Sequence, residues 1–423
     1  RMAREASGEG EGEGVWAKAW AATEEELGRT GGPLKKALYC FRSQGDFELV
    51  ERLERALELQ WVYGYPRVPP GEDQLTHGFF KYMAGMQPAT ARELLRLLPE
   101  DARAVLDVFC GSGTVLIEAL AAGRRAVGND ASPMAVFVAS HHCDINRVDL
   151  EELLQLAEKA AAPLRGARDD WQELRNRIGE LATTAPLREA LWFVFVVALR
   201  VAASTPSRPA PRRTADPEGG LARPYFLSNA YRYVAQVRAL RRACPTTPRV
   251  SLHRGDVRQL RLAEPVDAII TSPPYPGVYN YIAAATEDRR MLGSVAGVGS
   301  GAPDFLREAA AGAFDTRQEV GAQELRTQQS LEDFLASWQK QQEEWLRTAY
   351  ANLRPGGTAT IMIGDGDTEY EEGGVDCLAS TIAAAEAAGF AFRASASVES
   401  CADAAHRTKG MVRTEHMVHL HRP

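Results

Sequence analysis

An apolar run that ends in two prolines constrains this chain more than any other feature. Positions 266–270 read Val-Asp-Ala-Ile-Ile, and Thr-Ser-Pro-Pro-Tyr follows at 271–275. Proline has no N–H for a sheet ladder, and the residue before it is kept out of the helical region. The strand must therefore end here, in a stiff turn with fixed carbonyl groups that presents Tyr275. Taken alone, the cluster also fits a loop that merely stops a strand.

A second motif makes a binding role more plausible than a simple stop. Positions 105–114 read Val-Leu-Asp-Val-Phe-Cys-Gly-Ser-Gly-Thr, and an apolar helical pattern follows to 120. This predicts a strand, a glycine-rich turn and a helix, whose first N–H groups point outward. Such turns bind nucleotide-type cofactors, although they also serve packing alone. The third glycine of the dinucleotide fingerprint and the Gly-Lys-Ser/Thr of a P-loop are both missing.

Two further predicted strands lead into acidic residues. The segment 125–130 ends in Asp130, where a carboxylate can bind ribose hydroxyls, with a solvated loop aspartate as the alternative. Asp256 follows the segment 250–255 and is a candidate acceptor for the exocyclic amine of an adenine. Strands that alternate with helices predict an α/β fold with a mostly parallel, doubly wound sheet and its ligand at the carboxyl ends of the strands.

Taken in order, these pieces resemble the S-adenosylmethionine-dependent DNA amino-methyltransferases, the N4-cytosine and N6-adenine family, of Ser-Pro-Pro-Tyr type. The matching pieces are Asp-Val-Phe-Cys-Gly-Ser-Gly at 107–113, Gly-Asn-Asp at 128–130, Gly-Asp at 255–256, and 271–275. Positions 76–82 with Gln87-Pro88 resemble the segment that closes over the methionine part of the cofactor. Positions 353–364 and 414–420 resemble the later strands of the family. The resemblance covers 75–145 and 247–423 and implies a Rossmann-like class I methyltransferase fold.

The resemblance also implies a cofactor and its binding residues. The cofactor is S-adenosyl-L-methionine, and no metal is expected. The residues expected to bind it are Thr76, His77, Asp107, Phe109, Cys110, Gly111, Gly113, Thr114, Asn129, Asp130 and Asp256.

The catalytic residues that the resemblance implies are Ser272, Pro273, Pro274 and Tyr275, which we call the box. Ser272 would accept one hydrogen of the exocyclic amine, the carbonyl of Pro273 would accept the other, and Tyr275 would stack on the base. An exocyclic amine is a poor nucleophile because its lone pair is delocalised into the ring. Accepting its hydrogens exposes that lone pair, so the methyl group moves directly to nitrogen through positioning and electrostatics. The target base must first leave the duplex stack.

The identity of the base follows from the first residue of the box. In this family a serine favours cytosine N4 and an aspartate favours adenine N6, so we expect N4-methylcytosine, with N6-methyladenine as the alternative. Methylation at cytosine C5 needs a nucleophilic cysteine, and none of the six cysteines follows a proline. The chain departs from many serine-box members because its cofactor turn precedes the box.

Two other functions stay open at this point. Pro-Pro-Tyr also occurs in guanine-N2 tRNA methyltransferases, although those usually carry an aspartate first and an RNA-capture domain in front. A non-catalytic subunit would keep the fold and bind a partner, but degenerate members normally lose the glycine turn or the box. Both motifs are intact here.

Charge and aromatic residues indicate where a nucleic acid would bind. The net charge of −7 argues against a large non-specific DNA surface. Arginines nevertheless gather between 208 and 242, and Arg212 and Arg213 are predicted to contact DNA, with a solvated helix face as the alternative. Tyr279 and Tyr281 are candidate pocket residues, with core packing as the alternative. DNA is the expected partner, and a homodimer is considered.

The chain divides into five predicted parts. These are an acidic Gly/Glu tail at 1–14, expected to be disordered; a helical extension at 15–75; the cofactor half at 76–145; a helical insert at 146–246; and the catalytic half at 247–423. Within the insert we expect helices at 150–164, 169–181, 187–203 and near 228–244, and a role in substrate recognition.

The apolar run 191–199 is too short to span a membrane. Scattered cysteines fit a reducing compartment, so we expect an intracellular enzyme, nuclear in a eukaryote and cytoplasmic in a bacterium.

Overall fold

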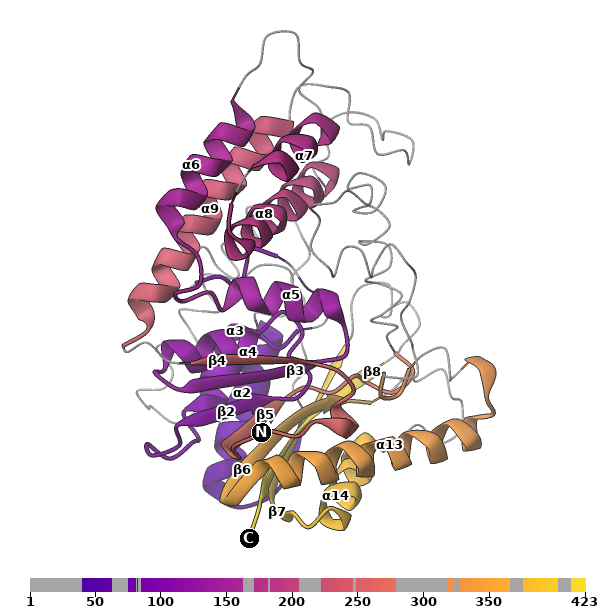
Figure 1. Cartoon of the computed structure of the whole chain (residues 1–423). Helices are drawn as coiled ribbons and strands as arrows, with labels where there is room; N and C mark the ends of the chain where they lie inside the picture. Colours follow the sequence, from indigo (N-terminus) through magenta and orange to yellow (C-terminus); the bar gives the residue numbers. More distant parts are fainter. Residues whose placement is uncertain are drawn as a thin grey trace, which may run out of the picture.

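The structure is a computed structural model and describes residues 40–62, 75–80, 82, 85–162, 171–181, 183–204, 222–245, 249–278, 319–322, 327–365, 376–401 and 412–423. Its centre is an eight-stranded sheet in the order β1-β7-β8-β6-β5-β2-β3-β4 (Figure 1). The strands are β1 (Cys40–Gly45), β2 (Ala104–Asp107), β3 (Arg125–Asp130), β4 (Val250–Arg254), β5 (Val266–Thr271), β6 (Leu353–Gly364), β7 (Ala391–Cys401) and β8 (Val412–His421).

Strand direction divides the sheet into two parts. β6, β5, β2, β3 and β4 are parallel neighbours, so their carboxyl ends meet at one edge of the sheet. β8 lies between β6 and β7 and is antiparallel to both. Apart from β1, which is also reversed and pairs at the edge, a parallel doubly wound sheet with one reversed strand is the topology of the class I methyltransferases. The predicted α/β fold class is therefore confirmed.

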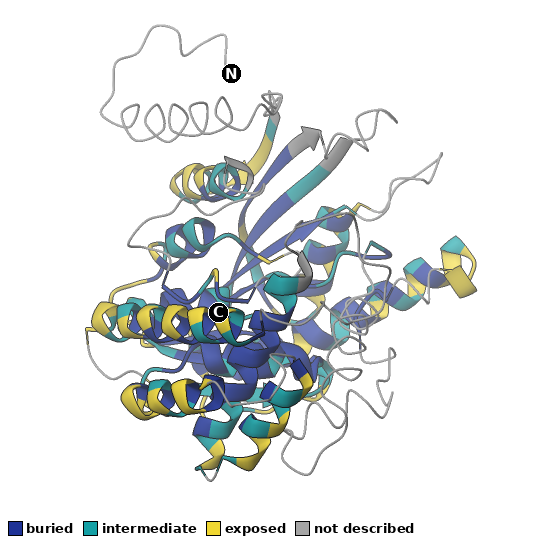
Figure 2. Cartoon of the chain, turned by 90° about the horizontal axis from the view of Figure 1, so that it is seen from above, coloured by how far each residue is buried: buried dark blue, intermediate teal, exposed yellow. Residues whose placement is uncertain are grey.

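Helices cover both faces of the sheet. One face carries α2 (Phe47–Val62), α3 (Pro88–Leu95) and α4 (Thr114–Ala121), and the other carries α13 (Leu331–Asn352) and α14 (Cys377–Ala387). Successive strand residues point to opposite faces. In β2, for example, Val105 packs in the core on the α4 side while Leu106 packs in the core on the α13 side. Figure 2 shows the central strands largely buried beneath helices with exposed outer faces, whereas the edge strand β1 is mostly exposed.

The N-terminal extension differs from its prediction. Positions 15–75 were expected to be helical, but Cys40–Gly45 form β1, which pairs antiparallel with β7 at the edge of the sheet. The helical pattern that begins at Phe47 is present as α2, and Leu53 and Leu57 are fully buried in the main core. Residues 40–45 show no clear alternation of apolar and polar side chains. They form a strand because β7 has an unpaired edge, which only the folded chain shows.

The helical insert is present with four helices in the described residues. They are α6 (Leu150–Ala161), α7 (Trp171–Glu180), α8 (Ala185–Ser204) and α9 (Ala222–Ala243). The apolar run 191–199 lies in α8, is buried throughout, and forms the centre of a core of its own. Figure 1 shows these helices stacked beyond α5 (Pro133–His142), on the side away from α13 and α14. Their role in substrate recognition stays a prediction. Among the described helices, none combines the length and the apolar character that crossing a lipid bilayer requires.

Candidate active site

The glycine turn between β2 and α4 forms as the sequence predicts. Gly111 has φ +49° and Gly113 has φ +89°, a left-handed conformation that glycine adopts without strain. A Cβ on Gly111 would lie 3.4 Å from the ring of Tyr82, and one on Gly113 would lie 3.3 Å from Ala139 of α5. The first glycine therefore leaves room beneath an aromatic ring, and the second lets α4 and α5 approach.

Asp107 at the end of β2 is tied to the neighbouring strand β5. Its Oδ1 accepts a hydrogen bond of 2.7 Å from the hydroxyl of Thr271 and one of 3.2 Å from the backbone N–H of Phe109. Burial raises the pKa of Asp107 to about 7, although these two hydrogen bonds act in the opposite direction. The bond to Thr271 joins the start of the glycine turn to the residue that directly precedes the box.

Asp130 at the end of β3 holds the glycine turn from its other side. Its Oδ2 accepts 2.9 Å from the N–H of Gly111, and its Oδ1 accepts 2.8 Å from the N–H of Ser132. Burial raises the pKa of Asp130 to about 6. The carboxylate is therefore oriented by two backbone groups at a position that lines the cleft described next, and each oxygen retains a further lone pair for a ligand.

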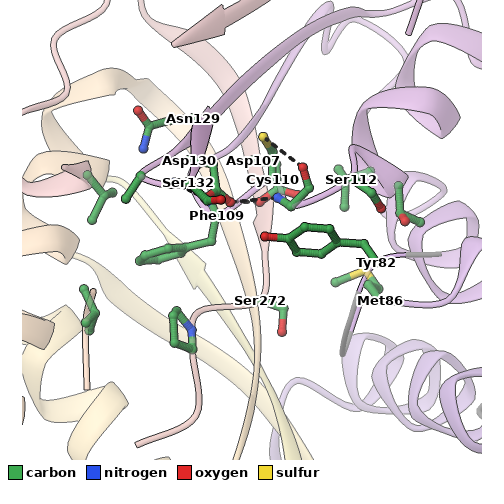
Figure 3. Close-up of a pocket in the computed structure, with 18 of the residues that line it drawn as sticks. Tyr82, Met86, Asp107, Phe109, Cys110, Ser112, Asn129, Asp130, Ser132 and Ser272 are labelled. Carbon is green, nitrogen blue, oxygen red and sulfur yellow. Dashed lines mark hydrogen bonds between the residues drawn. The ribbon is translucent and has the colours of Figure 1, made fainter. Parts of the chain in front are cut away.

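A cleft at the carboxyl ends of the parallel strands brings the turn and the box together (Figure 3). It contains about 890 Å³ of atom-free space, including its open mouth. The predicted residues that line it are Asp107, Phe109, Cys110, Gly111, Thr114, Asn129, Asp130, Ser272 and Pro274. The two motifs, more than 150 residues apart in sequence, thus face one space.

Six predicted residues that the structure describes are not among those that line the cleft. They are Thr76, His77, Gly113, Asp256, Pro273 and Tyr275. The hydroxyl of Thr76 donates to the carbonyl of His142 at 2.6 Å, and His77 Nε2 lies 2.8 Å from Glu118 Oε1. Both side chains are therefore hydrogen-bonded to neighbouring helices, Thr76 to α5 and His77 to α4. Tyr279, Tyr281, Arg212 and Arg213 lie outside the described residues.

Asp256 has a different partner from the amine that the sequence suggested. Its carboxylate receives the guanidinium of Arg258 at 2.8, 3.0 and 2.6 Å, and its Oδ1 also caps the short helix η2 (Val257–Gln259). Val257, the next residue, lines the cleft instead. The strand end is where the sequence placed it, but its carboxylate is already engaged in an ion pair.

Tyr275 is fixed by two elements from the far end of the chain. Its hydroxyl donates 2.9 Å to Glu415 of β8. Its ring lies against Gly364 of β6, where a Cβ would stand only 2.5 Å from a ring carbon. The aromatic residue of the box thus has one defined orientation next to the cleft.

Sequence reasoning missed several cleft residues. They are Tyr82, Gly85, Met86, Ser112, Val115, Ala131, Ser132, Val257, Glu319 and Val320. Tyr82 points into the cleft in Figure 3, near the glycine turn and above Ser272. It belongs to the segment 76–82 that was compared with the family's cofactor lid, so a signal for it was present. Ser132 also had a signal, because it caps α5 directly before Pro133. Glu319 had none.

His142 connects the cofactor turn to the segment before it. Its Nδ1 donates to the carbonyl of Ser112 at 2.9 Å, and its Nε2 accepts from the N–H of Phe80 at 3.2 Å. Burial lowers its pKa to about 3, so the ring is neutral and both nitrogens are used. The His-His-Cys-Asp run at 141–144 lies at a helix end, because α5 stops at His142. Within the described residues, no group of three or more metal-type side chains lies together.

Arginines of α9 make contacts both within the insert and with the segment before the glycine turn. Arg232 donates to the carbonyl of Phe79 at 3.1 Å and lies over its ring, 4.8 Å from the centroid. Arg238 pairs with Glu151 of α6, and Arg241 donates to a backbone carbonyl at 2.8 Å. At these positions the arginines bind other parts of the protein, and the DNA contacts expected of Arg212 and Arg213 stay a prediction.

The sheet order and the position of this cleft are those of the class I methyltransferase fold. Residues 29–139 match a family model described as DNA methylase, of the N6/N4 type. No curated protein matches the chain.

Solved structures with related backbones have low identity. TrmN from Thermus thermophilus is 15% identical over 85% of this chain and 55% of its own, with a TM-score of 0.34. The rRNA methyltransferase aviRa from Streptomyces viridochromogenes is 11% identical over 84% and 94%, with a TM-score of 0.33. A S-adenosylmethionine-dependent methyltransferase from Methanosarcina mazei is 8% identical over 78% and 96%, with a TM-score of 0.31. The chain thus spans about 55% of the length of TrmN.

Proposed function

We propose that this protein transfers a methyl group from S-adenosyl-L-methionine to the exocyclic N4 of cytosine in DNA. The observation that carries the proposal is the shared cleft, in which Ser272 and Pro274 face the same space as Gly111 and Asp130. A direct transfer requires donor and acceptor in contact, and this cleft gives both a place. The match of residues 29–139 to a DNA methylase family model supports the amine as acceptor and DNA as partner.

The residues of the cleft fit the cofactor. Asp130 is oriented by two backbone N–H groups and would accept hydrogen bonds from ribose hydroxyls. The bare backbone of Gly111 beneath Tyr82 allows close approach of a ligand. Met86, Phe109 and Val257 add apolar surface, as an adenine-bearing ligand requires. When bound, the cofactor supplies an electrophilic methyl group on a sulfonium.

The box would prepare the amine for attack. Ser272 lines the cleft and would accept one amine hydrogen, and the carbonyl of Pro273 would accept the second. These acceptors would draw the nitrogen lone pair out of the ring, and nitrogen would form its bond to the methyl carbon as that carbon's bond to sulfur breaks and its electron pair stays on sulfur. The methylated nitrogen then loses one proton to water. Tyr275, whose ring is fixed on Gly364, would stack on the flipped base.

The choice of cytosine rests on Ser272 in the first position of the box, and adenine N6 is the alternative within the same chemistry.

Since the substrate is DNA, we place the enzyme inside the cell, in the nucleus of a eukaryotic host or the cytoplasm of a bacterial one. Light scattering of the purified chain tests for a homodimer.

Incubation with S-adenosylmethionine and mixed-sequence DNA, with RNA in parallel, tests the proposal. The nucleosides are then released and identified by mass spectrometry. N4-methyldeoxycytidine is expected, and a Ser272→Ala variant should form much less of it. N6-methyldeoxyadenosine would change the base but keep the mechanism. Methylation of RNA alone would refute DNA as substrate, and cofactor binding without any product would refute the catalytic role.

A further inference from the structure

The side chain of Tyr82 lies in the cleft between the glycine turn and the box. A Cβ on Gly111 would stand only 3.4 Å from its ring, so the ring lies directly beside the turn. In Figure 3 the same ring extends into the cleft, with Ser272 of the box beneath it. A ligand that reaches from the turn to the box therefore has to contact Tyr82.

The segment that carries Tyr82 is fixed from two sides. The N–H of Phe80 donates to His142 Nε2 of α5 at 3.2 Å, and Arg232 of α9 donates to the carbonyl of Phe79 at 3.1 Å. Tyr82 itself packs against the buried core of the insert. The position of the ring is thus set by the fold on both sides of the segment.

The cleft has an acidic character. Asp107, Asp130 and Glu319 line it, and none of its lining residues within the described ranges is a lysine, an arginine or a histidine. Negative charges in a partly enclosed site favour a cationic ligand over a neutral one. Burial raises the pKa of Asp107 to about 7 and that of Asp130 to about 6, so both carboxyl groups are largely ionised at pH 8.

An aromatic ring adds to this preference, because the negative face of its π-system attracts cations. Within the described lining, the other aromatic residue is Phe109, whose ring makes an edge contact with Trp345 of α13 at 5.3 Å between centroids. Tyr82 is the aromatic residue placed between the two motifs, where the donor and the acceptor of a methyl group would meet.

We propose that the ring of Tyr82 contacts the positively charged methyl-donating centre of the bound ligand and makes the cleft prefer a cation at that point. In S-adenosyl-L-methionine this centre is a sulfonium, whereas in the product S-adenosylhomocysteine it is a neutral thioether. The inference rests on the proposed function and assigns a specificity-determining role to a residue outside both motifs. Its consequence is that the site selects the charged donor over the spent product.

Calorimetry at pH 8 with three ligands tests the inference. S-adenosylmethionine and sinefungin carry a cation at the donating centre, a sulfonium and an ammonium respectively, and S-adenosylhomocysteine carries none. Tyr82→Leu removes the ring but keeps an apolar side chain, and Tyr82→Phe keeps the ring. Tyr231→Leu is the matched control, the same change at an exposed tyrosine of α9. Thermal unfolding verifies that each variant folds.

The expected result is a loss that depends on ligand charge. The wild type should bind both cationic ligands more tightly than S-adenosylhomocysteine. Tyr82→Leu should weaken the two cationic ligands roughly 5- to 30-fold and S-adenosylhomocysteine by less than about 2-fold. Tyr82→Phe and Tyr231→Leu should both resemble the wild type.

Three results would overturn the inference and leave the proposed function standing. They are a wild type that binds the product as tightly as the two cations, equal losses for all three ligands in Tyr82→Leu, and equal losses in Tyr82→Phe and Tyr82→Leu. The first needs no variant, so it applies even if Tyr82→Leu does not fold. A folded wild type that binds none of the three ligands would instead overturn the proposed function, and this inference with it.

Discussion

The hydroxyl of Tyr275 donates a hydrogen bond of 2.9 Å to Oε1 of Glu415, which joins the box after β5 to the reversed strand β8. Glu415 pairs with Gly364 across β6 and β8. The hydrogen bond that holds Tyr275 therefore lies next to the Gly364 backbone beneath its ring. Two residues 140 positions apart thereby fix the plane against which a base would stack.

Replacing Gly364 with alanine should displace the ring of Tyr275. The new Cβ would stand 2.5 Å from a ring carbon, which no side chain tolerates without movement. We expect kcat for DNA methylation to fall at least 10-fold while the affinity for S-adenosylhomocysteine stays within about 2-fold, roughly 0.4 kcal/mol. Gly179→Ala is the matched control, because a Cβ there has open space and α7 gains a better helix former. Equal kinetics in the two variants would refute the role of Gly364.

Substitutions that weaken the hydrogen bond between Tyr275 and Glu415 should separate the orientation of the ring from its stacking on the base. Tyr275→Phe keeps the ring and loses the bond to Glu415, and Glu415→Gln keeps a side chain of the same shape with a weaker acceptor. Both should lower kcat by about 3- to 10-fold, since one hydrogen bond contributes about 1 kcal/mol. Tyr275→Ala should cost far more, because the stacking surface is lost. If phenylalanine and alanine were equally harmful, the hydroxyl and not the ring would be the important group.

Asp107 should make the stability of the protein depend on pH. Burial raises its pKa to about 7, so the folded protein holds the proton more firmly than the unfolded chain, whose aspartates titrate near 4. This stabilising contribution is complete in acid and is lost as the pH rises through about 7. Asp107→Asn is neutral at every pH, so its free energy of unfolding should increasingly exceed that of the wild type between pH 5 and 8, by a few kcal/mol.

Urea unfolding at pH 5 and pH 8 measures this difference. Glu100→Gln, the same chemical change on an exposed residue, is the control and should show no such trend. A constant difference between Asp107→Asn and the wild type across this range would contradict the prediction.

Asp130 should control the affinity for the cofactor. Asp130→Ala leaves the N–H groups of Gly111 and Ser132 without their acceptor and removes the group that would bind ribose. We expect S-adenosylhomocysteine to bind at least 10-fold more weakly, as measured by calorimetry. In the wild type, binding should strengthen as the pH rises through about 6, because burial raises the pKa of Asp130 to that value and the ionised carboxylate is the better acceptor. Asp130→Ala should lose that pH dependence, and unchanged affinity would exclude the ribose role.

Local patterns predicted a large part of this protein. The strand, glycine turn and helix at 105–120, the strand that stops at the box, and the four helices of the insert all formed where residue spacing placed them. These features depend on neighbours along the chain: apolar periodicity, positive-φ glycines and the limits that proline sets on the backbone. The order of these elements also indicated the doubly wound sheet.

Contacts between distant segments decided the rest. β1 is a strand because β7 pairs with it, and Arg232 packs on Phe79 because α9 crosses that segment. Glu319 and Glu415 carry no local mark of function, since their neighbours in sequence say nothing about the box. By itself the sequence determined the elements and the two motifs. Only the tertiary structure decided which side chains share the cleft, because a partner is chosen by the packing of elements that lie far apart along the chain.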